Sequence, residues 1–354
     1  TLADFYTQRF KEDIASLGIL MPHVMPKVSE HINEQIELIK VLENKAFTYK
    51  TSDGVYFDTS KDEHYGKLSK LGKETESRVE NKEKKNSRDF ALWKFNSHLG
   101  FPSPWGQGFP GWHIECSAMS SKYLGNSFDI HTGGIDLAPI HHNNEIAQSE
   151  NACGCEFVRY WLHNEFVNIP SGKMAKSEST GVNLASIVKH GFSPLAYRYF
   201  LLMAQYRTPV IFTWEALEAA QNAYRKLKEV FSGLIRANGR IDENYKKLFE
   251  EALENDLNTP EALAVMWKLV KDESMPDQDK RATLLDFDKI LGLDLENNEF
   301  EVKDLPEEVE KLIKERKSVR ASGDYTKSDE LRKQIEVLGF HIEDTATGQK
   351  ISKF

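Results

Sequence analysis

Cysteine is scarce in this sequence, where Cys116, Cys153 and Cys155 are the only three among 354 residues. Three cysteines are too few for a disulfide framework, which predicts ordinary thiols and a reducing, cytoplasmic compartment. Long apolar runs are also missing, since no stretch approaches the ~20 residues of a membrane-spanning helix. Residues 1–5 lack the charged start and apolar core of a secretory signal. These absences argue against a disulfide-rich secreted protein and predict no membrane partner.

The chain as a whole has no excess of positive charge, because its formal net charge is −9. A general nucleic-acid binder is therefore not expected, because phosphate contacts come mostly from lysine and arginine. One segment reverses the sign, because residues 311–333 hold eight basic and four acidic side chains, a local charge of plus 4. A solvated helical face and an RNA-binding surface explain this segment equally well.

The length and composition fit a soluble globular protein of two or more domains. The 354 residues exceed the usual size of a single core, and 40% of them are hydrophobic. In the first hundred residues, local patterns predict a helix capped by Ser29, a hairpin, a charged exposed segment and an irregular connector. These elements are expected at residues 32–39, at 46–50 with 55–58, at 61–86 and at 102–111.

Residues 112–167 alternate between strand and helix patterns, which is typical of an α/β unit. Residues 128–131 are expected to form a short buried strand that leads into Gly133 and Gly134. Glycines at the carboxyl end of such a strand let the backbone approach a nucleotide, and Asp136 is placed to bond a ribose hydroxyl. A tight turn alone explains the same glycines.

Beyond residue 190 the apolar residues recur at helical spacing. Helices are expected to begin at Ser193 and at Thr213, and a further helix is expected over residues 245–257. The stripes predict the core of a helical bundle rather than a cofactor site. An acidic linker at 297–304 is expected to separate a last segment.

Cys116, His141 and Glu145 offer a thiol, an imidazole and a carboxylate within a short stretch. These are the side chains that bind zinc. His141 and Glu145 are four residues apart, which places them on one face of a helix, and the glycine turn before them lets the chain fold back. The spacing predicts a metal site.

A second candidate for chemistry is the segment Lys173-Met174-Ala175-Lys176-Ser177, which follows Ser171-Gly172. Two lysines three residues apart on a glycine- and serine-rich loop can close over a triphosphate and neutralise the charge that grows at phosphorus. A solvent-facing lysine pair explains the same residues in isolation.

Four segments together resemble the motifs of the cysteinyl-tRNA synthetases, a family of class I aminoacyl-tRNA synthetases. They are Gly-Trp-His-Ile-Glu-Cys-Ser-Ala-Met at 111–119, His-x-Gly-Gly-x-Asp at 131–136, His-His-x-Asn-Glu-Ile-Ala-Gln at 141–148 and Lys-Met-Ala-Lys-Ser at 173–177. The resemblance continues through 256–260 and 320–332, so it covers nearly the whole chain.

The resemblance implies an α/β class I synthetase catalytic domain, followed by an α-helical bundle and a small C-terminal domain. The catalytic part would be the second half of a Rossmann-like fold with a connective insertion. The implied divisions are 1–108 for the end of the first catalytic half and the connective insertion, 109–168 for the second half, 169–205 for the lysine loop and stem-contact region, 206–296 for the anticodon-binding bundle and 297–354 for an anticodon-recognition segment.

The resemblance also implies activation of L-cysteine by ATP with Mg²⁺, then transfer to tRNA(Cys). Cys116, His141 and Glu145 would hold one zinc ion per chain, and its open position would take the substrate thiolate. A borderline-soft ion prefers sulfur to a hydroxyl, so serine is rejected without an editing domain. Trp112 and His113 would line the amino-acid pocket.

ATP would be bound by residues of two motifs. They are Gly133, Gly134, Asp136, Met174, Lys176 and Ser177. Lys173 and Lys176 would be catalytic, because they would stabilise the α-phosphate as the substrate carboxylate attacks it. The residues expected to read anticodon bases are Asn258, Arg320, Tyr325 and Asp329. An aromatic ring and a guanidinium suit splayed bases. The implied protein is a cytoplasmic monomer.

The sequence departs from the family's pattern at several positions. Ala175 stands where the family has serine, and Pro139-Ile140 stands where it has Phe-Pro. The first nucleotide-binding half, with a His-Ile-Gly-His motif and one more cysteine ligand, is expected to precede Thr1. Residues 98–101 imitate that motif but lie in the connector, which makes the match a coincidence. The 354-residue chain alone is therefore expected to be inactive.

Two alternatives to a cysteine–tRNA ligase stay open. A cysteine ligase acting on an amino sugar would share the catalytic motifs but would not be expected to keep residues 311–354. A non-catalytic tRNA-binding fragment is the second alternative, and a His-Ile-Gly-His motif upstream would exclude it.

Overall fold

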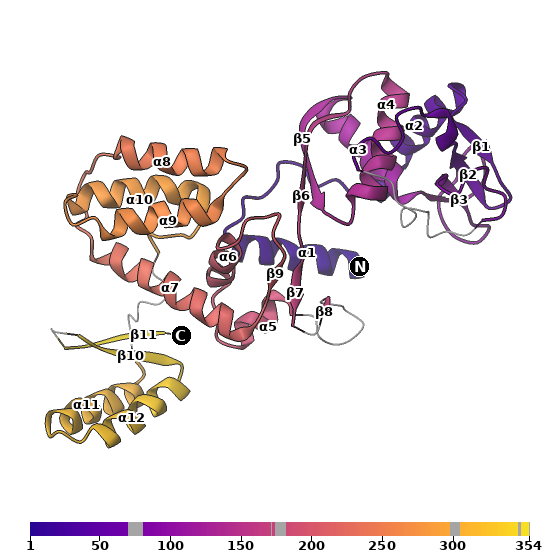
Figure 1. The fold of residues 1–354 in the computed structure, drawn as a ribbon. Helices are drawn as coiled ribbons and strands as arrows, with labels where there is room; N and C mark the ends of the chain where they lie inside the picture. Colours follow the sequence, from indigo (N-terminus) through magenta and orange to yellow (C-terminus); the bar gives the residue numbers. More distant parts are fainter. Residues whose placement is uncertain (70–80, 171, 174–181, 298–304, 346–347, 354) are drawn as a thin grey trace. The chain divides into compact units, whose positions relative to one another are not determined.

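The computed structural model describes residues 1–69, 81–170, 172–173, 182–297, 305–345 and 348–353. Within these ranges the chain forms two compact units, and Figure 1 labels most of their helices and strands. One unit is Pro22–Phe166, and the other combines Thr1–Met21 with Val167–Phe354. Among the described helices, none has the length and apolar character needed to cross a membrane.

A four-stranded antiparallel sheet forms one part of the Pro22–Phe166 unit. Its order is β1 (Thr48–Lys50), β2 (Gly54–Phe57), β3 (Phe90–Phe95) and β4 (Gly108–Pro110). Helix α2 (Ile32–Asn44) contributes Ile36, Ile39 and Leu42 to the core shared with this sheet. The predicted hairpin is confirmed, because Thr48 pairs with Phe57 across the turn.

Two local expectations for this region are wrong. Ser29 does not cap α2, because it lies in a short 3-10 turn, Val28–Glu30, and His31 takes the capping position. Residues 102–111 are not irregular throughout, since β4 pairs with β3 and brings Phe109 opposite Lys94. Strand β3 itself was not expected, because its partner β2 lies more than thirty residues earlier and no local pattern reveals that pairing.

The second part of the unit joins helices to a parallel strand pair. Strand β5 (Phe128–Gly134) pairs with β6 (Val158–Asn164), and around them lie α3 (Trp112–Leu124), a π-helical turn at Ala138–His142 and α4 (Asn143–Cys153). The α/β character is thus confirmed. The expected burial of 128–131 is wrong, because β5 pairs only with β6 among the described strands and Ile130 is 58% exposed.

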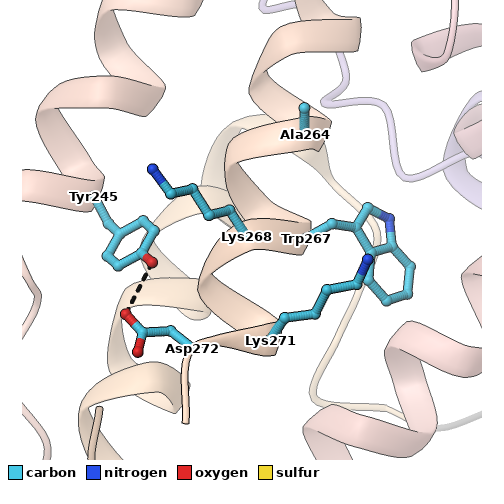
Figure 2. Close-up of a pocket in the computed structure, with 6 residues that line it drawn as sticks. All are labelled: Tyr245, Ala264, Trp267, Lys268, Lys271 and Asp272. Carbon is cyan, nitrogen blue, oxygen red and sulfur yellow. Dashed lines mark hydrogen bonds between the residues drawn. The ribbon is translucent and has the colours of Figure 1, made fainter. Parts of the chain in front are cut away.

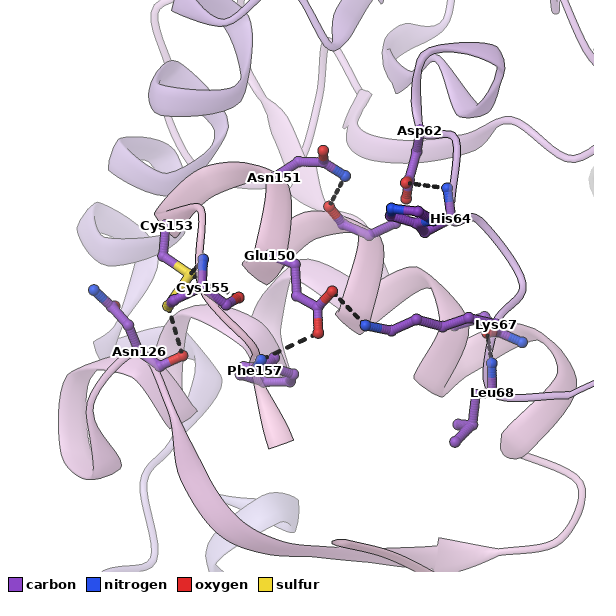
Figure 3. A network of polar contacts seen from close by, with 12 residues as sticks. Asp62, His64, Lys67, Leu68, Asn126, Glu150, Asn151, Cys153, Cys155 and Phe157 are labelled. Atoms are coloured by element: carbon purple, nitrogen blue, oxygen red, sulfur yellow. Dashed lines mark hydrogen bonds and ion pairs between the residues drawn. A yellow bond between two sulfur atoms is a disulfide. The ribbon is translucent and has the colours of Figure 1, made fainter. Parts of the chain in front are cut away.

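Polar contacts and a disulfide fix the end of α4 (Figure 3). The Glu150 carboxylate accepts a hydrogen bond from the backbone N–H of Phe157 at 3.1 Å and pairs with Lys67 at 2.6 Å. Cys153 and Cys155 form a disulfide, which corrects the expectation of ordinary thiols. The helix ends at Gly154, whose φ of 76° turns the chain so that the two sulfurs meet.

The other unit is mainly helical. Its elements are α1 (Leu2–Ser16), β7 (Val167–Ile169), β8 (Gly172–Lys173), α5 (Leu184–Lys189), α6 (Pro194–Leu202), β9 (Val210–Ile211), α7 (Trp214–Gly233), α8 (Glu243–Glu254), α9 (Thr259–Lys271) and α10 (Asp277–Leu291). The predicted cap at Ser193 is confirmed, because its hydroxyl accepts from a backbone N–H group of α6, and the helix expected from Thr213 onward is confirmed as α7, which the Thr213 hydroxyl caps. The helix expected to reach residue 257 stops at Glu254, since Asp256 and Leu257 have positive φ.

The C-terminal segment folds as a helical hairpin followed by a strand hairpin. Its elements are α11 (Glu307–Ala321), α12 (Tyr325–Val337), β10 (Phe340–Thr345) and β11 (Gly348–Lys353). Its small core contains Val309, Ile335, Phe340 and Ile342. The expected acidic linker lies outside the described residues except for Asn297.

Candidate active site

Three elements of the Pro22–Phe166 unit deliver the predicted metal ligands to one place. Cys116 comes from α3, His141 from the π-helical turn and Glu145 from the first turn of α4. Their ligand atoms all lie within 4.8 Å of one another, and the His141 and Glu145 side chains are buried. The predicted convergence of thiol, imidazole and carboxylate is therefore present in the fold.

Glu145 lies at the centre of this cluster. One of its carboxylate oxygens lies 2.7 Å from His141 Nε2, and the other lies 3.3 Å from His131 Nε2. Among the described residues, neither oxygen accepts a hydrogen bond of normal geometry, although the side chain is only 1% exposed. A buried carboxylate without hydrogen bonds is costly unless a cation compensates it. The cluster therefore fits a metal ion.

The thiol of Cys116 holds its proton in the metal-free protein. Burial first, and then the nearby carboxylates of Glu145 and Glu115, raise its pKa to about 12. A bound cation reverses this effect, because it stabilises the thiolate and makes the neighbouring carboxylate favourable. The thiolate of Cys116 and the carboxylate of Glu145 would both be stabilised by a cation between them.

Histidines surround Glu145 more densely than the sequence analysis predicted. His113 Nδ1 lies 2.9 Å from His141 Nδ1, and His142 Nδ1 lies 2.8 Å from His163 Nε2. Burial first, and then the neighbouring imidazoles, lower the pKa of both His113 and His142 to about 3. These rings are neutral near pH 7, so they leave nitrogen lone pairs available inside the site.

His131, His142 and His163 were not among the predicted site residues. In the parallel pair Gly133 lies opposite His163 and His131 lies opposite Trp161, and the rings of both histidines lie against the His142 ring. His131 and His142 form a second possible metal-binding group with Glu145. The sequence offered two signals for this larger cluster. They are the paired histidines at 141–142 and the histidine near the end of β6.

The predicted amino-acid pocket residues lie beside the cluster at different depths. Trp112 is 64% exposed, and its ring centroid lies 4.6 Å from that of His141. His113 instead packs edge-on against Phe90, with ring centroids 5.6 Å apart. Trp112 is thus at the rim of the metal-ligand cluster, while His113 forms part of its wall.

The predicted nucleotide turn follows the end of β5. A Cβ on Gly133 would meet His142 Cε1 at 2.6 Å, and a Cβ on Gly134 would meet an Asp136 carboxylate oxygen at 2.6 Å. The close approach at Gly133 is to a buried side chain of the histidine cluster, which disfavours a larger residue there, whereas the exposed Asp136 side chain can move away from a Cβ at Gly134. Asp136 lies directly after the strand end.

The lysine motif is mostly outside the part of the chain that the structure describes. Met174, Lys176 and Ser177 fall in the undescribed range 174–181. The backbone of Lys173 lies in β8, where it pairs with Asn168 of β7.

The residues predicted to read bases occupy two segments. The Asn258 side chain caps α9, because its oxygen accepts from the backbone N–H of Glu261. In the C-terminal segment the Arg320 guanidinium lies over the Tyr325 ring, 5.7 Å from its centroid. Asp329 is exposed and lies 3.9 Å from Arg332.

Three arginines converge on one carboxylate beside these residues. Arg316 donates two hydrogen bonds to Asp344, at 2.9 and 2.8 Å, and Arg320 and Arg332 each lie 3.2 Å from the same group. The cluster keeps a positive charge that Asp344 only partly neutralises. Asp344 was not predicted as part of this surface, because strand pairing of β10 with β11 places it there.

Three family models match the chain. One described as tRNA synthetases class I (C) catalytic domain matches residues 1–222. One described as cysteinyl-tRNA ligase anticodon binding domain matches residues 302–351, and the DALR domain matches residues 248–273.

Individual proteins give the same relationship. Cysteine–tRNA ligase 1 of Burkholderia lata is 42% identical, over 99% of this chain and 76% of that protein. Cysteine–tRNA ligase of Treponema denticola is 40% identical, over 98% of this chain and 78% of that protein. The crystal structure of Mycobacterium tuberculosis methionyl-tRNA synthetase bound by methionyl-adenylate shares the fold, with a TM-score of 0.51, 13% identity and coverage of 82% of this chain and 76% of that one.

The fold and these matches define a class I aminoacyl-tRNA synthetase. Within that class, the chain belongs to the cysteinyl-tRNA synthetase family. The predicted fold class and the prediction of a cysteine–tRNA ligase are thereby confirmed. The match over 302–351 also separates this chain from the amino-sugar alternative, which was not expected to keep an anticodon-binding tail.

Proposed function

We propose that Cys116, His141 and Glu145 hold a zinc ion that selects the thiol of L-cysteine during activation by ATP. The observation that carries the proposal is Glu145, a buried carboxylate with no hydrogen bond of normal geometry among the described residues, set between a thiol and an imidazole. This donor set of sulfur, nitrogen and oxygen suits zinc. When bound, the ion supplies an open position that favours a thiolate over a hydroxyl.

The first ligand set is preferred over the group of His131, His142 and Glu145. Both sets use Glu145, so one cation satisfies only one of them at a time. The thiol of Cys116 is the distinguishing donor, because sulfur ligands favour zinc over the harder divalent ions. In this assignment His131 and His142 are neutral neighbours, since burial lowers the pKa of both.

The chemistry proposed for the site has two steps. The carboxylate of cysteine attacks the α-phosphorus of ATP, and the bond to pyrophosphate breaks to leave cysteinyl-adenylate. A terminal ribose hydroxyl of tRNA(Cys) then attacks the activated carbonyl, and AMP departs. Trp112 and His113 are assigned to the amino-acid pocket, beside the His141 ring.

ATP and its Mg²⁺ are assigned to the turn after β5 and to the lysine motif. Gly133 and Gly134 allow close backbone approach, and Asp136 offers an acceptor for a ribose hydroxyl. Lys173 and Lys176, with Met174 and Ser177, would neutralise charge on the phosphates. Positive charge is most useful where negative charge grows during attack.

The tRNA is assigned to the helical bundle and to the C-terminal segment. Arg320 and Tyr325 support this, since a guanidinium above an exposed aromatic ring suits an unstacked base. Asp329 and Asn258 are proposed as further contacts. The working divisions remain 1–108, 109–168, 169–205, 206–296 and 297–354, for a cytoplasmic monomer.

The test is cysteine-dependent exchange of label between pyrophosphate and ATP, measured with a protein that contains this chain together with the first nucleotide-binding half of the family, and with serine offered as the competing substrate. We expect exchange with cysteine and a strong preference over serine, because only the thiol provides the preferred zinc ligand. Equal exchange with both amino acids would overturn the selection by zinc. The absence of exchange with cysteine would overturn the assignment of activation to this site.

A further inference from the structure

The helical bundle carries a pocket of about 660 Å³ between α8 and α9, far along the chain from the metal ligands. Its lining is Tyr245, Ala264, Trp267, Lys268, Lys271 and Asp272. Figure 2 shows Tyr245 of α8 facing the side chains of α9 across this pocket. Two cationic chains and two aromatic rings thus share one concave surface.

The spacing of the residues explains how one helix lines the pocket. Ala264 lies three residues before Trp267 and four before Lys268, and Lys271 lies four residues after Trp267 and three after Lys268, which places the four side chains along one side of α9. Ala264 is small, so it leaves room at its end of this face. The pocket therefore follows from the sequence of α9 and its packing against α8 and not from a loop.

Hydrogen bonds hold both aromatic rings in place. The Trp267 indole N–H donates to the Tyr199 hydroxyl at 2.8 Å, and the Tyr245 hydroxyl donates to the Asp272 carboxylate at 2.9 Å. Asp272 also accepts from the backbone N–H and the hydroxyl of Ser274. The only carboxylate of the pocket is thus engaged by neutral donors, and these lower its pKa.

The two lysines differ from other lysines of the bundle. Lys246 and Lys247 of α8 pair with Glu250 and Glu251 one turn later. Within the described ranges, Lys268 and Lys271 have no carboxylate within 4.0 Å, and both are exposed. Their positive charges are therefore available to an anionic partner.

We propose that this pocket binds the sugar–phosphate backbone of the tRNA, an inference that rests on the proposed function. Lys268 and Lys271 contact phosphates, while the fixed Trp267 and Tyr245 rings border a ribose or base. Two ammonium groups one helical turn apart on an open surface suit successive phosphates of a polymer. The match of the DALR domain to residues 248–273 includes α9 entirely.

The experiment measures binding of a tRNA(Cys) transcript to the full chain by fluorescence anisotropy over a series of salt concentrations. The test variant is Lys268→Gln/Lys271→Gln. The plot of log affinity against log salt has a negative slope, and each lost phosphate contact makes that slope shallower by about 0.9. The slope of the double variant should therefore be shallower by about 1.8 than that of the unmodified chain. The ratio of the unmodified chain's affinity to that of the double variant should then be about 12-fold smaller at about 200 mM salt than at about 50 mM salt.

The matched control is Lys246→Gln/Lys247→Gln, which removes the same charge from paired lysines of the neighbouring helix. It should keep the salt slope of the unmodified chain. Equal losses of slope in both double variants would overturn the proposal, because the effect would then be that of net charge. An unchanged slope in Lys268→Gln/Lys271→Gln would also overturn it.

A third arm separates the pocket from the proposed function. If the unmodified chain binds no tRNA, the assignment of tRNA to this protein fails, and this inference with it. If tRNA binding is unaffected but calorimetry shows AMP binding that Lys268→Gln/Lys271→Gln abolishes, the pocket holds a free nucleotide and the proposal is wrong.

Discussion

Replacing Cys116 by alanine should remove most of the zinc bound to the protein. Structural zinc sites with four ligands bind with about 10–16 kcal/mol, or about 2.5–4 kcal/mol for each ligand. The structure offers three side-chain ligands whose atoms lie within 4.8 Å of one another. Loss of one of them should therefore weaken zinc affinity by about 100- to 1,000-fold. His141 and Glu145 remain in contact, at 2.7 Å, and keep the residual affinity.

The assay is metal analysis of the purified protein, followed by competition with a chromophoric chelator. The chain offers a matched control, because its other two cysteines form a disulfide away from the cluster. Cys153→Ser/Cys155→Ser removes two sulfur atoms and should leave the zinc content and affinity unchanged. Cys116→Ser keeps the approximate size of the side chain, and it should behave like Cys116→Ala.

Two results would refute this reasoning. Zinc content and affinity in Cys116→Ala equal to those of the unmodified protein would remove Cys116 from the ligand set. Loss of zinc in Cys153→Ser/Cys155→Ser alone would move the metal to the end of α4. Far-ultraviolet circular dichroism on each variant separates loss of the metal from loss of the fold.

Two further predictions concern packing and charge. Gly133→Ala should destabilise the protein by about 1–3 kcal/mol, because its Cβ would meet His142 at 2.6 Å. Thermal unfolding measures this loss, and Gly233→Ala is the control, because a Cβ at Gly233 has open space and should not destabilise the protein. Equal effects of the two substitutions would contradict the steric argument. Asp344→Asn should cost about 3 kcal/mol, since it leaves the fully buried Arg316 uncompensated. The Arg316 hydrogen bond lowers the Asp344 pKa from 3.8 to about 2, so this stabilisation is present above pH 3.8 and lost as the pH falls toward 2. Urea unfolding between pH 3.8 and about 2 should show this decrease in the free energy of unfolding in the unmodified chain and not in Asp344→Asn.

Features set by neighbouring residues were predicted well from the sequence. The hairpin of β1 and β2 and the helix starts at Ser193 and Thr213 depend on local hydrogen bonds and turn residues. The same local chemistry starts α1, where Thr1 and Asp4 form a capping box, although this helix was not predicted. The error at Ser29 arose because a 3-10 turn ended one residue before the helix cap.

Features that depend on distant pairing were not predictable in the same way. Strand β3 forms through its register with β2, and Asp344 meets Arg316 only after β10 is in place. The disulfide likewise depends on where α4 ends, because Gly154 turns the chain between the two cysteines. The convergence of the candidate metal ligands could be predicted because His141 and Glu145 are four residues apart, whereas His163 joins the cluster from another strand.

The positions of the proposed metal ligands depend on helix packing more than on loops. Ser117, which follows Cys116 on α3, accepts a hydrogen bond from the Gln148 amide of α4 at 2.9 Å, and both side chains are buried. The Ser117 hydroxyl also donates to the backbone carbonyl of Glu145 at 3.4 Å. Because these bonds lie one residue from the thiol and at the carboxylate residue itself, the spacing between the two ligands is set by α3 against α4. Selection of a thiol by coordination needs that fixed spacing, since a site that adapts its shape would admit a hydroxyl as well.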